Sequence, residues 1–308
     1  MSTAPDCELP DRHNATNGFD AGLLAAAEEA GLNASAAPEQ RWLDGWLLRA
    51  CPVKAKRSRC IYPLAPGRLA LADRLARARE AYQAAGLPLV LRITPLVPAE
   101  RSGALLDDEL DRLGLARIDD TRVMIHADLA GADLSDALST SAVGAGSSGR
   151  LDPADRPTGC GPGQGDAVSD TCRVQPCDPA SFAELIGQLR GTPALQRAAH
   201  ARRLQLAPVR HVALTLRDAS GDLRACGQYA REGDRVGLFD VAVPAQRRGQ
   251  GWARRLCATL LACARDEGAR LAYLQVEADN TPARAIYHRL GFADGYGYHY
   301  RCDDPAAV

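Results

Sequence analysis

Hydrophobic and polar positions along the chain follow two periods, and each period predicts one kind of element. Apolar residues at every third or fourth position predict helices, whereas short apolar runs rich in Val, Ile and Phe predict strands. The two patterns alternate through the first 130 residues. We expect helix 21–32, a hairpin-like strand region 42–49, strand 60–64, helix 70–85, strand 87–94, helix 104–113 and strand 121–128.

The second half continues the alternation and predicts an α/β (α+β) fold. Two helices come first, followed by a hairpin, a buried strand, a helix closed by Gly268, a further strand and a last helix. These elements are expected at 179–190, 193–206, 210–218 with 223–232, 236–243, 253–267, 271–277 and 282–290.

The order strand, helix, strand, helix, glycine, strand occurs in both halves of the chain. Residues 108–115 align with residues 285–292, so that Gly114 corresponds to Gly291. We interpret residues 19–128 as a degenerate copy of the C-terminal domain, residues 172–308. An unrelated α/β domain is the alternative for the first copy.

Two segments are predicted to lack a core of their own. Residues 1–18 are polar, and we expect them to be disordered. Residues 129–171 are expected to form a flexible linker, because from 135 onward they are rich in Ser, Gly, Pro, Ala and Asp and hold almost no large apolar residue.

Composition excludes several classes of protein. The chain of 308 residues carries 37 Lys and Arg against 38 Asp and Glu, so no general affinity for nucleic acid or for an acidic membrane is expected. The N-terminus is acidic and no stretch approaches membrane-spanning length, which favours a cytoplasmic protein. The ten cysteines include no Cys-x-x-Cys pair, so we expect reduced thiols and no metal.

One loop organises the candidate chemistry. It follows the strand that ends at Val243, carries Gly249 and Gly251, and opens the helix that begins near Ala253. Unpaired amides at a helix N-terminus bind anions, and glycine lets a phosphate approach the backbone. The flanking cations that we expect at the rim of this pyrophosphate site are Arg247, Arg248, Arg254 and Arg255.

Two nucleotide-binding motifs fit the loop poorly. No Gly-Lys-Ser/Thr ending is present, which excludes a P-loop. A dinucleotide-binding fold has Gly249-x-Gly251 and an acid, Glu277, in its favour. However, Arg254 stands at the third glycine position, and only about thirty residues follow Glu277, too few for the second half of that fold.

The loop resembles motif A of the GNAT N-acetyltransferases, Gln/Arg-x-x-Gly-x-Gly/Ala, with Gln246, Gly249 and Gly251 at its fixed positions. A second GNAT signature, Asn-x-x-Ala-x-x-x-Tyr-x-x-x-Gly-Phe, is similar to residues 280–292. The resemblance covers roughly residues 174–301. It implies two GNAT-like domains, each a mixed twisted sheet flanked by helices, joined by the flexible linker.

The resemblance also implies an activity: direct transfer of the acetyl group of acetyl-CoA to a primary amine. The acceptor would be an amine-bearing small molecule or a protein, with no metal and no required oligomer. Because residues 65–70 replace the loop in the first copy and Leu110 replaces its tyrosine, only the second copy would be active. The residues implied to hold acetyl-CoA are Val241, Val243, Arg248, Gly249, Gln250, Gly251, Trp252, Ala253 and Asn280.

The resemblance makes Tyr287 the acid that protonates the CoA sulfur. Glu277 is our candidate base, and Asp240 is a second one. His200 and His211 fall in the region expected to bind the acceptor, without a defined geometry. A non-enzymatic acetyl-CoA-binding regulator, which could dispense with Tyr287, remains the alternative function.

Overall fold

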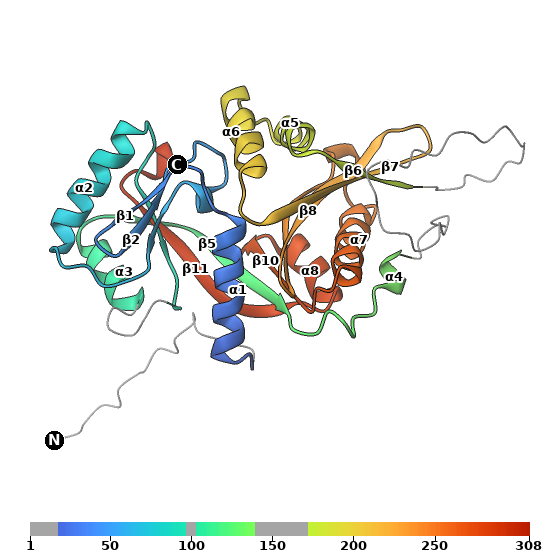
Figure 1. The fold of residues 1–308 in the computed structure, drawn as a ribbon, viewed down its shortest axis with the longest axis horizontal. Helices are drawn as coiled ribbons and strands as arrows, with labels where there is room; N and C mark the ends of the chain where they lie inside the picture. The colour runs from blue at the N-terminus through green and yellow to red at the C-terminus, as the bar shows by residue number, and fades with distance from the viewer. Residues whose placement is uncertain (1–17, 97–102, 139–171) are drawn as a thin grey trace, which may run out of the picture.

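The computed structural model describes residues 18–96, 103–138 and 172–308. Residues 1–17 of the predicted disordered N-terminus and residues 139–171 of the predicted linker lie outside the described residues. Within the described ranges the strands of both halves join one mixed sheet (Figure 1). The order of its strands is β1-β2-β3-β4-β11-β5-β10-β9-β8-β7-β6.

The elements follow the predicted order closely. The strands are β1 Gln40–Leu43, β2 Trp46–Arg49, β3 Ile61–Pro63, β4 Val90–Ile93, β5 Ala116–His126, β6 Arg173–Cys177, β7 Arg210–Arg217, β8 Leu223–Glu232, β9 Arg235–Ala242, β10 Leu271–Glu277 and β11 Ala293–Cys302. The helices are α1 Ala21–Ala34, α2 Leu71–Ala84, α3 Gly103–Arg112, α4 Ser135–Leu138, α5 Pro179–Leu189, α6 Ala194–Gln205, α7 Trp252–Asp266 and α8 Thr281–Arg289.

The halves share one topological unit. In the first half β3 and β4 are parallel and α2 connects them, and in the second half β9 and β10 are parallel and α7 connects them. Each unit is followed by one helix and one long strand. This repeat, together with the mixed α/β sheet, confirms the predicted fold class of two GNAT-like domains.

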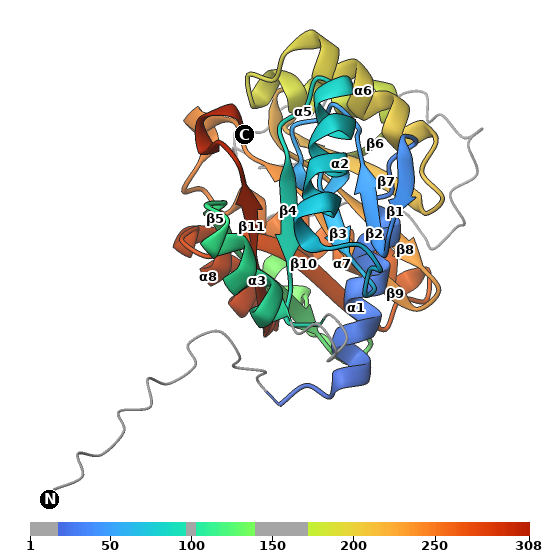
Figure 2. The ribbon, with the colours of Figure 1, turned by 90° about the vertical axis from the view of Figure 1, so that its left-hand side faces the viewer.

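The two halves exchange their last strands (Figures 1 and 2). β5, from the first half, pairs with β10 of the second half from Thr121 to His126. β11, from the second half, pairs with β4 of the first half, and β5 and β11 pair with each other in antiparallel fashion. Gly291 permits this packing, because a Cβ on it would lie 2.6 Å from Nε2 of His126 on β5.

The sheet buries a different core on each face. Leu238 and Leu274 pack with α7 on one face, whereas Phe239 and Tyr273 pack with α1 on the other. α5 and α6 cover the same face as α1 over β7 and β8, where Phe182 and Cys226 are buried together. A ligand that reached from α7 toward α5 would therefore have to pass through the sheet.

The predicted linker, 129–171, begins too early. Leu129, Leu134 and Ala137 are at most 4 % exposed and belong to the core beneath α7. The four-residue helix α4 lies in this segment, and the Arg265 side chain donates a hydrogen bond of 2.9 Å to the Ala132 carbonyl. The scarcity of large apolar residues that indicates a linker sets in only after these positions.

No helix in residues 18–96, 103–138 and 172–308 is long and apolar enough to cross a membrane.

Candidate functional site

The loop between β9 and α7 has the backbone that an anion site requires. Gly249 and Gly251 have φ angles of +74° and +81°, in the left-handed region that favours glycine. A Cβ built on either one meets no described atom within 4 Å, so the space beside the loop is open. Gly251 is the N-cap residue and has no side chain that could cap α7. No side chain in the described part of the chain therefore caps the N-terminus of α7, where the amides and the helix dipole favour an anion.

The four arginines near the loop do not all lie at its rim. Arg248 is exposed, and Arg247 lies at its edge, 3.7 Å from the Asp222 carboxylate. Arg255 is only 6 % exposed, and its guanidinium carbon lies 5.7 Å from the ring centre of Trp252. The prediction that Arg255 belongs to the rim is wrong, because its helical position turns it into the core with the Trp252 side chain.

β9 and β10 separate beside this loop. Their parallel pairing runs from Arg235 opposite Leu271 to Leu238 opposite Leu274, although β9 continues to Ala242 and β10 to Glu277. The predicted ligand position Val241 lies in this unpaired part of β9, and Val243 follows directly after the strand. Both side chains are partly buried and pack against the core beneath α7.

A β-bulge in β9 redirects Asp240. Gln228 of β8 pairs with Phe239 and Cys226 pairs with Ala242, so two residues of β9 stand opposite one residue of β8. Asp240 has a φ of +53° within this bulge. Its carboxylate consequently points to the same face as the Phe239 ring, toward α5 and α6.

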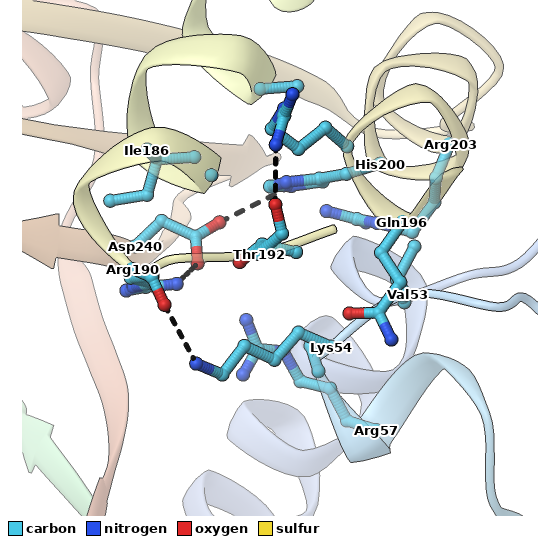
Figure 3. A pocket seen from close by; sticks show the side chains of 14 residues that line it. Val53, Lys54, Arg57, Ile186, Arg190, Thr192, Gln196, His200, Arg203 and Asp240 are labelled. Atoms are coloured by element: carbon cyan, nitrogen blue, oxygen red, sulfur yellow. Dashed lines mark hydrogen bonds and ion pairs between the residues drawn. The ribbon is translucent and has the colours of Figure 1, made fainter. Parts of the chain in front are cut away.

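On that face the structure holds a pocket between the two halves of the chain (Figure 3). Its empty volume is about 420 Å³, counting the open mouth. One wall comes from the segment 53–57 of the first half, and the others come from α5, α6 and the loop between them. The charged or titratable lining residues are Lys54, Arg57, Arg190, Arg197, His200, Arg203 and Asp240.

Asp240 forms the floor of this pocket (Figure 3). Its carboxylate accepts hydrogen bonds of 2.7 Å from Arg190 Nη1 and from Gln228 Nε2, and it lies 3.5 Å from His200 Nε2. Burial would raise the pKa of Asp240, but the charges of Arg190, His200 and Arg57 outweigh it and hold that pKa far below its ordinary value. A carboxylate that is so stable as an anion is a poor proton acceptor, which weakens Asp240 as a candidate base.

Burial also controls the two histidines near the pocket. It lowers the pKa of His200 to about 4, with the Asp240 carboxylate acting in the opposite direction. Burial lowers the pKa of His211 to about 4 as well. The His211 Nδ1 atom lies 2.9 Å from the Val209 carbonyl oxygen, and its ring lies 6.1 Å from that of Phe239. Both imidazoles are therefore neutral at pH 7.

Tyr287 lies on the other face of the sheet, on α8. Its ring packs edge-on against Phe292 at 6.1 Å and borders the core beneath α7. Burial raises the pKa of Tyr287 well above its usual range, while the charge of Arg190 acts in the opposite direction. The Arg190 guanidinium on the α5 side is thus within electrostatic reach of the Tyr287 hydroxyl.

The remaining predicted residues lie at the open end of the gap between β9 and β10. Glu277 ends β10, opposite Thr121 of β5, and its side chain is exposed. Strand alternation puts it on the face of Tyr273, but it does not line the pocket. Asn280 caps α8, since its Oδ1 accepts a hydrogen bond of 3.2 Å from the Ala283 amide.

Sequence reasoning named Asp240 and His200 but missed the cationic residues that line the pocket with them. Lys54 and Arg57 come from the first half, more than 180 residues before Asp240, and Arg190 lies just after α5. The sequence around Lys54 and Arg57 gave little indication of a binding site. Lys54 and Lys56, the only lysines of the chain, stand beside Arg57 in a segment with no other feature.

Two family models match separate parts of the sequence. Residues 187–292 match the acetyltransferase (GNAT) family. Residues 24–114 match the family described as "Probable histone acetyltransferase Rv0428c C-terminal". The comparison with curated proteins gave no match.

Two solved structures share the fold over most of the chain. A GCN5-related N-acetyltransferase from Kribbella flavida has a TM-score of 0.56 and 16% identity, over 94% of this chain and 96% of that one. A functionally unknown conserved protein from Staphylococcus epidermidis has a TM-score of 0.52 and 10% identity, over 86% of this chain and 94% of that one.

Proposed function

We propose that this chain, an acyltransferase whose residues 187–292 form a GNAT acetyltransferase domain, transfers the acetyl group of acetyl-CoA directly to a primary amine. One observation carries the proposal: an uncapped helix N-terminus with two left-handed glycines lies beside the point where β9 leaves β10. The loop offers a site for a pyrophosphate. The opening between the strands offers a path through the sheet for a narrow pantetheine arm.

In this proposal the main chain holds the co-substrate. The amides from Arg248 to Ala253 bind the pyrophosphate, with Gly249, Gln250, Gly251 and Trp252 between them. The free edge of β9 at Val241 and Val243 pairs with the pantetheine as an added strand would. An amide of this edge polarises the thioester carbonyl. Asn280 Nδ2 donates to the pantetheine, because the helix cap uses only Oδ1.

The transfer forms one bond and breaks another. The amine nitrogen attacks the thioester carbonyl, a C–N bond forms, and the C–S bond breaks with its electron pair left on sulfur. Tyr287 donates its phenolic proton to that sulfur. Burial keeps the phenol protonated but also makes it a weaker acid, so donation accompanies C–S cleavage.

The proton of the amine needs an acceptor, and Glu277 fills this role in the proposal. Its exposed carboxylate ends β10 at the mouth of the opening and reaches the amine through water. Asp240 serves the site differently: it holds Arg190 and His200 in place instead of taking the proton.

The test is a panel of amines with acetyl-CoA, assayed for release of free CoA. An acetylated amine product identified by mass spectrometry supports the proposal. Tight CoA binding without acetylation of any amine would favour the regulator. Absence of CoA binding in a folded protein would reject both functions.

A further inference from the structure

The pocket between the two halves carries more positive charge than its own residues neutralise. Five cationic side chains line it, Lys54, Arg57, Arg190, Arg197 and Arg203, against the single carboxylate of Asp240. Arg190 is paired with Asp240 at 2.7 Å, and Arg197 is paired with Glu184 at 2.8 Å. The other three cations account for the excess.

These three side chains form no ion pair with any residue that the structure describes. Lys54 Nζ lies 3.5 Å from the Arg190 carbonyl oxygen, and Arg203 donates a hydrogen bond of 3.1 Å to the Ala34 carbonyl. The guanidinium carbon of Arg57 lies 5.1 Å from the ring centre of Phe239. Arg203 is only 4 % exposed, and burial lowers its pKa to about 10, so it remains charged at neutral pH.

The place of the pocket connects it with the proposed reaction. Asp240 both lines the pocket and lies in the part of β9, after Leu238, that no longer pairs with β10. Asp240 thus places the pocket beside the opening between the strands, and the segment 53–57 forms the wall that comes from the first half. The segment brings Lys54 and Arg57 from the first half of the chain (Figure 3).

We propose that this pocket binds the acceptor and selects amines that also carry an anionic group, a carboxylate or a phosphate. Arg57, with Lys54 and Arg203, binds the anion, and the amine end lies toward Asp240 and the opening between β9 and β10. The inference rests on the proposed acetyl transfer for its amine end, but the anion site stands on the pocket itself. It also gives the first half of the chain a role, since that half supplies the anion-binding wall.

The surrounding cations have a second effect on the acceptor. The charges of Arg190, Arg57 and Arg203 around the pocket repel an ammonium group at its amine end and outnumber the Asp240 carboxylate that attracts it, which lowers the pKa of the bound amine. The neutral amine is the form that attacks the thioester. Purely cationic acceptors, with several amines and no anion, are therefore disfavoured by the same residues that hold an anionic acceptor.

A panel of matched amines tests the selectivity. Alanine is compared with alaninamide, and phosphoethanolamine with ethanolamine, so that each pair differs in its anionic group. The expected result is a kcat/KM at least about tenfold higher for the anionic member of one pair, the size of one charge-assisted contact. A preference within the alanine pair would identify the preferred anionic group as a carboxylate, and a preference within the ethanolamine pair would identify it as a phosphate. Equal or better use of the neutral members would overturn the inference.

Substitutions test whether Arg57 causes the preference for anionic acceptors. Arg57→Gln should remove the advantage of the anionic acceptor and leave the KM for acetyl-CoA unchanged, whereas Arg57→Lys should restore most of it. Arg202→Gln is the matched control, because Arg202 lies on α6 beside Arg203, pairs with Glu39 and does not line the pocket. An equal loss for anionic and neutral acceptors in Arg57→Gln would contradict an anion-binding role.

A binding measurement separates this inference from the proposed function. Inorganic phosphate is titrated calorimetrically into protein saturated with CoA, which blocks the α7 loop. Arg57→Gln should weaken phosphate binding about tenfold, and Arg202→Gln should not. If CoA does not bind, the proposed function fails, yet the comparison of the two variants still decides the anion site. Absence of phosphate binding to the wild-type pocket, or equal binding by both variants, would overturn it.

Discussion

The backbone amide of Leu69 donates a hydrogen bond of 2.8 Å to Oδ2 of Asp44. The neighbouring amide of Arg68 donates one of 2.8 Å to Oδ1 of the same carboxylate. These bonds hold the pKa of Asp44 below its ordinary value, so the carboxylate is charged at neutral pH. Gly67 permits the approach, since a Cβ there would lie 2.3 Å from Asp44 Oδ2.

This contact supports the prediction that the first half binds no CoA. The amides stand just before α2, which connects β3 to β4 as α7 connects β9 to β10. In the first half a carboxylate of the chain accepts hydrogen bonds from the amides of the loop that corresponds to the proposed pyrophosphate loop of the second half. We therefore expect one CoA per chain. Isothermal titration calorimetry measures the stoichiometry, and two equivalents would contradict the prediction.

Gly249→Glu should abolish CoA binding while the protein stays folded. The side chain puts bulk and negative charge in the open space beside the α7 N-terminus, and Glu at a left-handed φ costs roughly 1 kcal/mol of stability. Gly86→Glu is the matched control, because Gly86 also has a positive φ and open surroundings but follows α2. Calorimetry should show wild-type affinity for the control. Unchanged affinity in folded Gly249→Glu would exclude this loop as the site.

Tyr287→Phe should lower kcat and leave CoA affinity nearly unchanged. Proton-transfer catalysis is typically worth about 10²–10⁴-fold, and we expect the lower end because burial makes this phenol a weaker acid. The measurement is steady-state kinetics with an accepted amine. Tyr229→Phe serves as the control: it removes a buried hydroxyl that bonds to Glu267 at 3.0 Å, so it should affect stability and not kcat. A kcat within a few-fold of wild type in Tyr287→Phe would make Tyr287 a core residue only.

Stability should fall between pH 6.5 and pH 4 because of the buried histidines. Burial lowers the pKa values of His200 and His211 to about 4, so over this range the unfolded chain binds protons that the folded chain does not. Each histidine then costs about 1.4 kcal/mol per pH unit as the pH falls. Urea unfolding at pH 7, 6 and 5 measures the slope, and His211→Asn should reduce it. An unchanged slope in that variant would contradict the assignment.

Asp240→Asn should lower the free energy of unfolding by about 3 kcal/mol. This is the low end for breaking a buried ion pair, because Arg190 remains partly exposed. Asparagine tolerates the left-handed φ of +53°, so the variant isolates the loss of charge from backbone strain. Arg190→Gln should cost more, since it leaves the buried Asp240 carboxylate without its ion-pair partner, whereas Asp240→Asn leaves a guanidinium that water already reaches. Denaturant unfolding of the two variants checks the order, and an equal or smaller effect of Arg190→Gln would contradict it.

The sequence by itself determined the order of the elements and the loop that ends β9. Local periodicity is enough for this: α7 repeats apolar residues every four positions from Leu256 to Ala264, and Gly268 ends the helical segment. Gly249 and Gly251 are readable for the same reason. A left-handed backbone before a helix restricts the residue type at the position itself, so the requirement is local.

Only the tertiary structure decided how the two halves meet. β5 of the first half lies between β10 and β11 of the second half. The predicted domain boundaries at residues 128 and 172 implied instead that the strands of each half would pair only with one another. Strands pair through backbone groups that every residue carries. The pattern of β5 suits the edge of either half, and the sequence does not say which edge it joins.

The sequence also did not predict which face of the sheet the Asp240 carboxylate points to, or which charged residues surround it. In a regular strand, side chains alternate between the two faces of the sheet, so Asp240 would lie on the face opposite Phe239. The bulge instead turns the Asp240 carboxylate to the same face as Phe239. There it meets Arg190 from the end of α5 and Arg57 from the first half, residues that only folding brings together. The chemistry of each side chain can be read from the sequence, but a pocket forms only when folding brings together residues from distant segments. The sequence therefore identified the candidate co-substrate loop, and the tertiary structure supplied the pocket that we propose for the acceptor.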